Sequence, residues 1–504
     1  MTDREYIKTQ YLTNTMFATR YTFKMYYGRK FVIGQHHVSI GDVLDEVFAG
    51  KIKRLLINLP PRYSKTEEAV KVFVSKGLAI NPKSKFIHLS YSSSLAEDNS
   101  EAIKDIVTSD FYQELFPYVR IKKDSKGKKK WYTTKGGGVY VTGTGGQITG
   151  FGAGEVEDAE KRKEEEELNK ELEEFFEQIG NLTEFAGAIV IDDSIKPEDA
   201  QSAIIRDKIN LRFETTIRSR INSRNTPIIV IGQRLHKNDL PGYLIELEGR
   251  VEDGGEWTVL SLPAIYTDEN GEEQALWPFK QTLEELYKLR KANKYVFQGQ
   301  YMQDPVDLSG ERLWCFAFDK DRHTQKGLEL DPNIPVIQSW DFNRNPIACS
   351  IWQFPNGQPR CLESIEVDNA TVKMMCDVIE KKYPSVFFWL VTGDVNGKTK
   401  TAISHLDSFT IIKNHFQLSR NQMQYSGSNP GLADSRYFIN SIFEEYPILL
   451  DADKCKELIF DLENVKADND NKPVKESRTK KEQRADHLDN MRYALHRYYK
   501  EYSL

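Results

Sequence analysis

The sequence predicts an α/β protein with two domains, each built around its own sheet. Three observations indicate this class. Over residues 1–305, short apolar strands alternate with helical segments, which is typical of a mostly parallel sheet. A strand-forming run at 335–352 then begins a second set of strands, with a turn at its centre. The segment between them, 306–334, is mixed in composition and contains Gly310 and Pro332, as expected of an interdomain linker.

The composition indicates globular domains outside membranes. Of 504 residues, 39% are hydrophobic and 29% are charged, which is ordinary for globular proteins. There is no run of about eighteen apolar residues, and the opening MTDREYIKTQ is unlike a signal peptide. The five cysteines lack CxxC spacing, so we expect a reduced intracellular protein without a zinc module. The net charge of −6 does not exclude local DNA contacts, because basic clusters remain.

A candidate phosphate-binding loop follows the first long apolar strand. Leu55–Asn58 lead through a Pro-Pro turn to Lys65, Thr66 and a helix. In such a unit the loop amides and helix N-terminus face a phosphate, the Lys binds the β- and γ-phosphates, and the Thr hydroxyl binds Mg²⁺. Ser64 belongs to the same cradle, although it and Leu59 stand where the usual motif has glycines. The alternative is an ordinary turn with a surface lysine.

Two acidic residues end another apolar strand. The run from Ala186 to Pro197 is rich in β-branched residues and leads to Asp192 and Asp193. Carboxylates at the carboxyl end of a buried parallel strand suit a nucleotide site, where one binds Mg²⁺ and the other orients the attacking water. We assign the first role to Asp192 and the second to Asp193. Because Asp is one methylene shorter than Glu, Glu198 is an alternative base.

Three aspartates in the last third of the chain form a candidate metal site. Asp341 ends a strand that a turn joins to the next one, and Asp394 follows a later apolar strand. Asp489 lies on a helix, beside its buried stripe, and Asp486 could replace or assist it. Such carboxylates can hold two Mg²⁺ or Mn²⁺ ions about 4 Å apart, which activate water and stabilise the leaving oxygen of a phosphodiester. Glu363, on the next strand, is a further alternative.

Six motifs occur in an order that resembles one known family. They are LPPRYSKTE, SYSSSLAED, TGTGGQITGFGAG, IVIDDSIKPED, IIVIGQRLHKNDLPGYL and FQGQYMQDP. Together they resemble the large terminase subunit of tailed double-stranded DNA bacteriophages, over nearly the whole chain. The resemblance implies a P-loop ATPase domain of the RecA/ASCE-like type at 1–305 and an RNase-H-like nuclease domain at 335–504. The implied activities are ATP-driven translocation of double-stranded DNA into a procapsid and metal-dependent cutting of concatemeric DNA.

The resemblance also implies roles for individual side chains. Gln35 and His37 would seat the adenine of ATP, and Gln233 would sense its γ-phosphate. Arg62, which the loop brings near the phosphates, is the candidate for a catalytic arginine supplied within the chain. The family's nuclease positions correspond to Asp341, Asp394 and Asp489.

Partners and cofactors follow from the same resemblance. ATP with Mg²⁺ would occupy the first site, and two Mg²⁺ or Mn²⁺ ions the second. The implied partners are double-stranded DNA, a portal protein with its procapsid, a small terminase subunit, and further copies of the chain in a ring on the portal. The expected place of action is the cytoplasm of the host cell, with no membrane association and no place in the mature virion.

Two charged stretches stand outside these motifs. Residues 155–180 are almost entirely charged and interrupt the family pattern, which predicts a helix inserted on the surface of the first domain. The basic stretch Lys472–Arg484, shortly before Asp489, predicts either contacts with DNA phosphates or a solvated loop.

Two rival functions remain open from the sequence. One is a helicase-like DNA translocase or remodeller whose second domain binds nucleic acid without cutting it. The other is a nucleotide-gated docking scaffold that does not turn ATP over. Metal-dependent nicking of a plasmid distinguishes a nuclease from the first rival. A steady-state ATPase assay distinguishes an active ATPase from the second.

Overall fold

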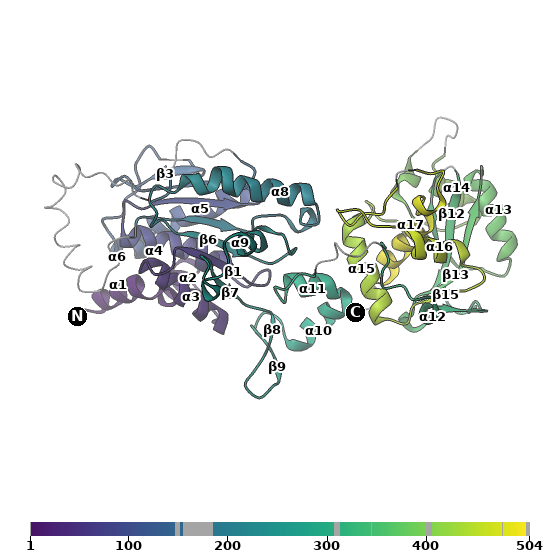
Figure 1. Ribbon diagram of the computed structural model, residues 1–504, viewed down its shortest axis with the longest axis horizontal. Helices are drawn as coiled ribbons and strands as arrows, with labels where there is room; N and C mark the ends of the chain where they lie inside the picture. The colour runs from purple at the N-terminus through teal and green to yellow at the C-terminus, as the bar shows by residue number, and fades with distance from the viewer. Residues whose placement is uncertain are drawn as a thin grey trace. The chain divides into compact units, whose positions relative to one another are not determined.

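The chain folds into two compact units, each with its own sheet (Figure 1). The structure, a computed structural model, describes residues 2–125, 127–146, 152–154, 185–306, 313–343, 345–399, 406–475 and 477–499. The first unit comprises Met1–Leu286 with Val296–Val306, and the second comprises Tyr287–Tyr295 with Asp307–Leu504. The charged insertion predicted at 155–180 lies outside the described residues.

A mostly parallel sheet forms the centre of the first unit. In the described residues it has seven strands in the order β3–β4–β2–β5–β6–β1–β7. These are β1 (Arg54–Asn58), β2 (Lys85–Ser90), β3 (Lys130–Tyr132), β4 (Gly138–Gly143), β5 (Ile189–Asp192), β6 (Ile228–Gly232) and β7 (Thr258–Ser261). Every neighbouring pair is parallel except β3 with β4. The predicted mostly parallel sheet is confirmed, and β1 and β5 are separated only by β6.

Helices pack on both faces of this sheet because its strands are apolar on both sides. Leu55 and Ile57 of β1 lie in one core, whereas Leu56 between them lies in the other. The first core is completed by α1 (Asp3–Thr13), α2 (Thr15–Tyr27), α3 (Gln35–Phe48), η1 (Glu67–Val72), α4 (Phe73–Ile80), α5 (Ser93–Thr108) and α6 (Asp110–Leu115). The second includes residues of η4 (Phe213–Ile217), which continues α8 (Ala203–Arg212), and of α9 (Leu240–Glu248).

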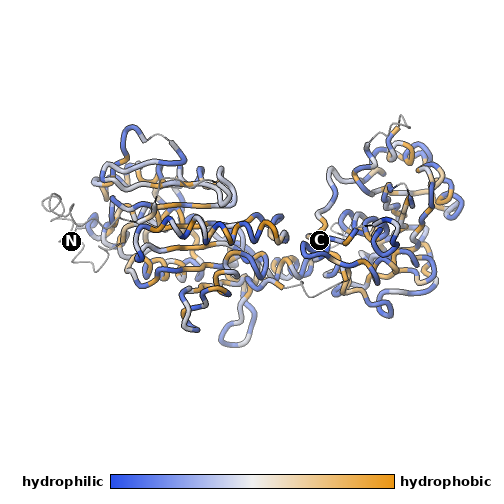
Figure 2. The backbone as a smooth tube through the Cα atoms, turned by 45° about the horizontal axis from the view of Figure 1, so that its top comes forward, coloured by the Kyte–Doolittle hydropathy of each residue, from blue (hydrophilic) through white to orange (hydrophobic). Residues whose placement is uncertain are grey.

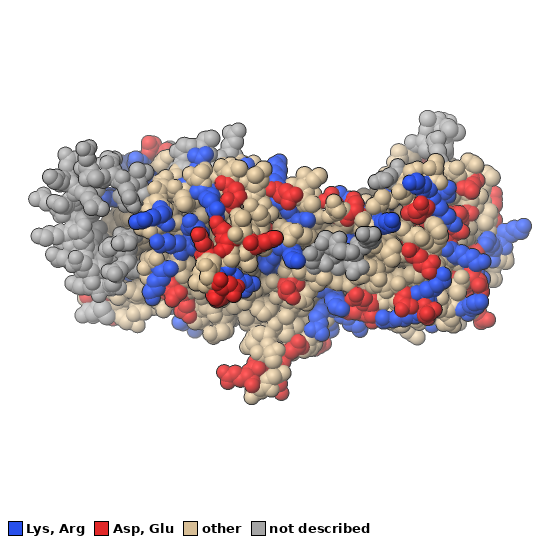
Figure 3. Space-filling view, in the orientation of Figure 1, with Lys and Arg blue, Asp and Glu red and all other residues tan. Residues whose placement is uncertain are grey.

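The rest of the first unit consists of smaller elements. The hairpin of β8 (Ile265–Thr267) and β9 (Glu273–Ala275) projects from the unit with acidic residues near its tip (Figure 3). Two helices, α10 (Leu283–Ala292) and α11 (Lys294–Gln300), each contain residues of both units. The edge strand β7 is short and ends at Ser261, shortly before a proline at 263.

The second unit has a mixed sheet. Among the described residues its strand order is β10–β15–β13–β12–β11–β14. The strands are β10 (Thr324–Gln325), β11 (Val336–Asp341), β12 (Ile347–Gln353), β13 (Arg360–Val367), β14 (Trp389–Gly393) and β15 (Leu449–Asp451). β11, β12 and β13 are antiparallel neighbours, and β14 is parallel to β11 on its other side. The expected hairpin that begins at Asp341 is confirmed, with Asp341 paired to Ala348.

Helices pack on both faces of this sheet too. One core includes Trp340 and residues of α13 (Val372–Lys382) and α14 (Ser408–His415). The other includes Ile337 and residues of α15 (Leu432–Glu445), α16 (Lys456–Asn464) and α17 (Asp486–Ala494). Figure 2 shows hydrophobic stretches running through the interior of each unit, with hydrophilic residues in the outer turns.

Part of the segment predicted as a linker belongs to the second unit. Trp314 is fully buried in the core beside α15 and α16, and its indole nitrogen donates to the carbonyl of Asn471 at 3.1 Å. The short helix α12 (Lys320–His323) and strand β10 follow, and β10 pairs with β15. The mixed composition of 306–334 did not reveal that a large aromatic side chain anchors the segment in this core.

Candidate active sites

The loop after β1 has a backbone that explains one departure from the usual motif. Ser64 has a φ of 62°, in the left-handed region that favours glycine. Its backbone therefore has the conformation expected of the glycine that the usual motif carries at this position, although the residue is a serine. Leu59, the other departure, is fully buried, and its amide donates to the carbonyl of Gly232 on β6 at 3.0 Å. The loop is thus fixed to the sheet at its start.

The structure brings the predicted lysine, threonine and aspartates together. The Nζ of Lys65 donates to Oδ1 of Asp193 at 2.6 Å, and the Oγ1 of Thr66 donates to Oδ2 of Asp192 at 2.6 Å. Lys65 and Thr66 follow β1, whereas the aspartates end β5. Because both strands are parallel to β6, their carboxyl ends lie at one edge of the sheet.

Asp192 has the environment of a metal ligand. Burial, followed by the negative charge of Asp193, raises the pKa of Asp192 to about 7, against the opposing effects of Lys65 and Thr66. Its Oδ1 is buried and has no hydrogen-bond partner among the described residues. An orphaned carboxylate oxygen beside a threonine hydroxyl is an all-oxygen donor pair, which suits Mg²⁺. The residues of this site therefore fit the metal that ATP carries.

A small cavity adjoins these groups at the carboxyl ends of β5 and β6. Asp193, Gly232, Gln233 and Asp239 are among its lining residues. The Oε1 of Gln233 is buried and without a hydrogen-bond partner in the described part of the chain. Arg234 is instead held by Asp239, at 2.9 Å between Nε and Oδ1. Of Gln233 and Arg234, Gln233 is thus the residue that lines the cavity together with Asp193.

The structure distinguishes the two candidate bases. Asp193 contacts Lys65, whereas Glu198 is largely exposed and pairs with Lys196, at 3.7 Å between Nζ and Oε2. Asp193 adopts a φ of 49°, a strained conformation that places its carboxylate at the site. In this structure Asp193 lies at Lys65 and Glu198 does not.

The remaining predicted nucleotide contacts lie around the loop with different exposures. Arg62 is exposed and has no ion-pair partner within the described ranges. Gln35, the first residue of α3, is also exposed. His37 is buried, its Nδ1 accepts from the amide of Gly34 at 2.8 Å, and its ring packs on Trp277. Burial lowers the pKa of His37 to about 3, so the ring is neutral and serves packing in this structure.

The second site gathers four carboxylates, one more than predicted. Asp341 ends β11, and the amide of Asp394 donates to the carbonyl of Trp340 on that strand at 2.9 Å. Asp486 and Asp489 come from α17, which packs on the same sheet, where Ser339 Oγ donates to the carbonyl of Asn490 at 2.6 Å. The structure therefore brings together all three predicted aspartates and the alternative, Asp486.

Mutual repulsion in this carboxylate cluster is evident at Asp341. Burial raises the pKa of Asp341 well above its usual range, and the charges of Asp489, Asp486 and Asp394 raise it further. Asn343 bridges two members, because its Nδ2 donates to Oδ2 of Asp341 and to Oδ1 of Asp486, each at 2.8 Å. Sequence analysis missed Asn343, although its position two residues after a strand-end aspartate was a usable signal.

Three cations compensate the cluster. Arg478 forms a two-pronged contact with Asp486, at 3.0 Å (Nη1–Oδ1) and 2.8 Å (Nη2–Oδ2). Lys475 pairs with Oδ2 of Asp489, and Arg492 donates to Oδ1 of the same carboxylate at 3.1 Å. Part of the predicted basic stretch, Lys472–Arg484, thus lies on the acidic site.

The donor set of the second site suits hard divalent ions. It consists of carboxylate oxygens, supported by side-chain amides such as Asn429, which donates to Oδ1 of Asp394 at 2.7 Å. Oxygen ligands of this kind suit Mg²⁺ or Mn²⁺ rather than zinc. In the described residues, the one group of three whose ligand atoms lie within 4.8 Å of one another is not in this cluster but consists of Asp377, Glu380 and His415. That trio joins α13 to α14, and two of its members are exposed.

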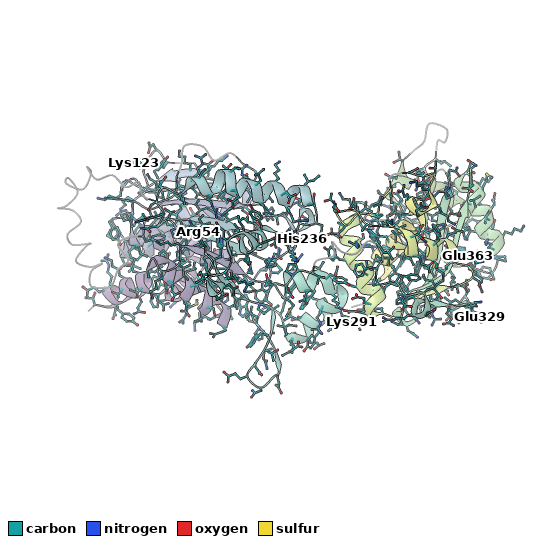
Figure 4. The ribbon with its side chains drawn as sticks, viewed as in Figure 1. Arg54, Lys123, His236, Lys291, Glu329 and Glu363 are labelled. Atoms are coloured by element: carbon teal, nitrogen blue, oxygen red, sulfur yellow. The ribbon has the colours of Figure 1, made fainter. Side chains whose placement is uncertain are left out.

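Glu363, the further alternative, is not a ligand of this site. Successive residues of a strand face opposite sides of the sheet. Glu363 pairs with Ile351, which pairs with Gln338, so Glu363 is in line with Gln338 and not with Asp341. Its carboxylate is held by Lys382 and by Tyr383, whose hydroxyl donates to Oε2 at 2.8 Å (Figure 4 labels Glu363). The residue of β13 on the row of Asp341 is Glu366, which contacts His487 at 3.2 Å.

Comparison with known proteins finds likeness in structure. No family model and no curated protein matches the sequence. Among solved structures, the large terminase from a thermophilic bacteriophage in complex with ATP-gamma-S is 13% identical, with a TM-score of 0.45, covering 92% of this chain and 99% of that one. The HK97 bacteriophage large terminase is 10% identical, with a TM-score of 0.34, covering 93% and 95%.

A third match covers about a third of the chain. The nuclease domain of the bacteriophage SPP1 large terminase with bound Mn is 16% identical, with a TM-score of 0.24, covering 35% of this chain and 95% of that one. The structures matched are large terminases. This is the family that the sequence motifs resemble. At such identities and TM-scores the likeness decides nothing about chemistry, which depends on the residues of the two sites. No helix in the described part of the chain is long and apolar enough to span a membrane.

Proposed function

We propose that this chain is a large terminase subunit, an ATP-driven DNA-packaging motor with a nuclease. The observation that carries the proposal is the presence of two acidic sites of different kinds in one chain. One places Lys65 and Thr66 against Asp193 and Asp192 at the edge of a parallel sheet. The other gathers four carboxylates around Asp341 on a separate mixed sheet. The first kind suits a nucleoside triphosphate and the second suits a phosphodiester.

The residues of the first site would divide the work of ATP hydrolysis. Lys65 would leave Asp193 for the β- and γ-phosphates, because a triphosphate offers more negative charge than one carboxylate. Asp193, once released, would orient the attacking water, and Gln233 would respond to the γ-phosphate. Thr66 and Asp192 would hold Mg²⁺, which neutralises charge on the phosphates. Arg62, exposed on the loop, can reach outward toward the phosphate group.

The residues of the second site would bind the metal ions of a nuclease. Asp341, Asp394, Asp486 and Asp489 would hold Mg²⁺ or Mn²⁺, which supplies activation of water and stabilisation of the leaving oxygen. Asn343 would keep Asp341 and Asp486 at a constant separation. Burial of Asp341, Asp486 and Asp489 limits their contact with bulk water, which strengthens each charge interaction.

The partners belong to the same proposal. Double-stranded DNA would be translocated by the first unit and cut by the second, at the start and end of packaging. A portal with its procapsid, a small terminase subunit and a ring of copies of this chain would complete the machine, in the host cytoplasm. Gln35 and His37 would lie near the adenine, because the ring of His36 packs 5.5 Å from that of Tyr63 in the phosphate loop.

A pair of variants separates the two activities. Lys65→Ala is expected to reduce steady-state ATP hydrolysis at least about 100-fold, because a buried lysine on the phosphates is worth several kcal/mol in the transition state. Plasmid cutting in Mn²⁺ should change less than about threefold, since the cutting residues lie in the other unit. Asp341→Asn should have the reverse effect. Matched controls are Lys51→Ala and Asp368→Asn, which alter exposed residues outside both sites.

The rival functions correspond to definite results. Cutting that survives Asp341→Asn refutes the nuclease assignment, and a chain that hydrolyses ATP and displaces a triplex strand without ever nicking DNA is a remodeller instead. A chain that binds ATP without turnover, with or without DNA, is a scaffold. Triplex displacement that depends on Lys65 supports the motor.

A further inference from the structure

The cations at the second site differ in how firmly they are held. Arg492 is buried, lies on α17 itself and also donates to the carbonyl of Pro430 at 2.6 Å. Lys475 and Arg478 come from the segment before α17, and their side chains are 33% and 46% exposed, whereas Asp489 and Asp486 are 9% and 2% exposed. Two half-exposed cations therefore cover two buried anions, and solvent reaches the cations far more than the carboxylates.

Lys475 and Arg478 occupy the oxygens that a metal ion would need. Both oxygens of Asp486 accept from Arg478, and Oδ1 accepts from Asn343 as well. Both oxygens of Asp489 are also occupied, by Lys475 and Arg492. A divalent ion binds carboxylates through the same lone pairs, so it competes directly with these contacts.

The attachment of the segment favours an exchange over a permanent contact. Val474 is fixed, because its amide donates to the carbonyl of Lys466 at 2.9 Å, and Trp314 anchors the adjoining turn through Asn471. The backbone of Arg478 is held because its carbonyl accepts from Nε of Arg484 at 2.9 Å, whereas its Nη2 also donates to the carbonyl of Asn345 at 3.1 Å, a contact that must break when the side chain leaves. The side chains can leave the carboxylates while the base of the segment stays in place.

We propose that Lys475 and Arg478 form a cation lock, which holds the nuclease site closed without metal and is displaced when divalent ions bind. The inference rests on the proposed nuclease function and adds its regulation. Displacement frees two positive side chains on the solvent side of the site, where they would meet the phosphates of an entering DNA strand. Binding of the metal ions and release of the side chains that contact DNA would then occur together.

Binding of Mn²⁺ to the nucleotide-free full chain, followed by the electron paramagnetic resonance signal of the free ion, tests the lock directly. Asp341→Asn identifies the component of binding that belongs to the carboxylate cluster. Lys475→Gln and Arg478→Gln should each tighten that component about five- to tenfold, since one competing cation is removed. The double variant should tighten it further. Lys480→Gln, an exposed lysine of the same segment, should change it less than about twofold.

A second measurement uses the unaltered protein, so a misfolded variant cannot obscure the answer. Mn²⁺ should increase amide exchange across 477–484 in the wild-type chain and not in Asp341→Asn. Unchanged or weaker Mn²⁺ binding in the double variant, with a wild-type melting curve, overturns the lock. So does amide exchange across 477–484 that is the same with and without Mn²⁺ in the wild-type chain. A chain that shows both expected effects but never cuts DNA refutes the nuclease and leaves the lock standing. A chain that cuts DNA without them refutes only the lock.

Discussion

The carboxylate of Asp461 holds the helix turn that carries two aspartates of the proposed nuclease site, and its removal gives a sharp prediction. α17 begins after Ala485, whose φ of 54° and apolar side chain leave the helix without a cap of its own. Asp461, on α16, supplies that cap: its Oδ2 accepts from the amides of His487 and Leu488, each at 3.0 Å. Asp486 and Asp489 lie in the turn that these two bonds hold.

The magnitude follows from the two amides. Asp461→Ala leaves both without partners in a buried place, at a cost of about 1 to 2 kcal/mol each. We therefore expect the local stability of the first turn of α17 to fall by about 2 to 4 kcal/mol. Asp461→Asn keeps an acceptor of the same shape and removes the charge of the Asp461 carboxylate. Burial raises the pKa of this carboxyl group to about 6. Its effect should stay within about 1 kcal/mol at pH 7.5.

Hydrogen exchange read by mass spectrometry over 486–494 measures this effect within the full chain. The alanine variant should exchange about 30- to 1,000-fold faster there, and its metal-dependent cutting should fall with it. Asp407→Ala is the matched control, because Asp407 caps α14 by accepting from the amide of Thr410 at 2.9 Å. It should loosen α14 and leave α17 unchanged. Wild-type exchange of α17 in Asp461→Ala would refute the reasoning.

Two further predictions concern the first unit. Burial lowers the pKa of His88 from 6.5 to about 4, so between those values the unfolded chain binds a proton that the folded chain does not. Stability should therefore fall as pH falls from 6.5, by at most about 1.4 kcal/mol per pH unit, and His88→Gln should lessen this slope in melting experiments; equal slopes would contradict it. Ser64→Gly relieves about 1 kcal/mol of backbone strain in the left-handed conformation, partly offset by the greater backbone entropy of glycine in the unfolded chain. This variant should keep full binding of a fluorescent ATP analogue. Ser64→Val should weaken that binding at least about tenfold, and a glycine variant that binds less tightly than wild type would show that the hydroxyl matters instead.

Local pattern was sufficient for the elements that carry each site. Apolar runs identified β1, β5 and β11, because a strand buried on a sheet needs such side chains whatever its neighbours are. The residues at their carboxyl ends could then be assigned, since parallel strands end at a common edge. Lys65 and Asp193 were assigned to one site on this ground, whereas Asp341 and Asp394 were grouped as strand-end carboxylates of a candidate metal site. The structure places each pair together.

Long-range register and helix rotation decided the rest. Only the pairing of β12 with β13 shows that Glu363 faces away from Asp341, and only the packing of α17 brings its two aspartates, Asp486 and Asp489, to Asp341. The burial of His37 depends in the same way on a distant tryptophan. Sequence alone therefore determined these strands and the residue types at their ends. Tertiary structure decided which neighbouring side chains share a site, because that depends on contacts between residues far apart in the chain.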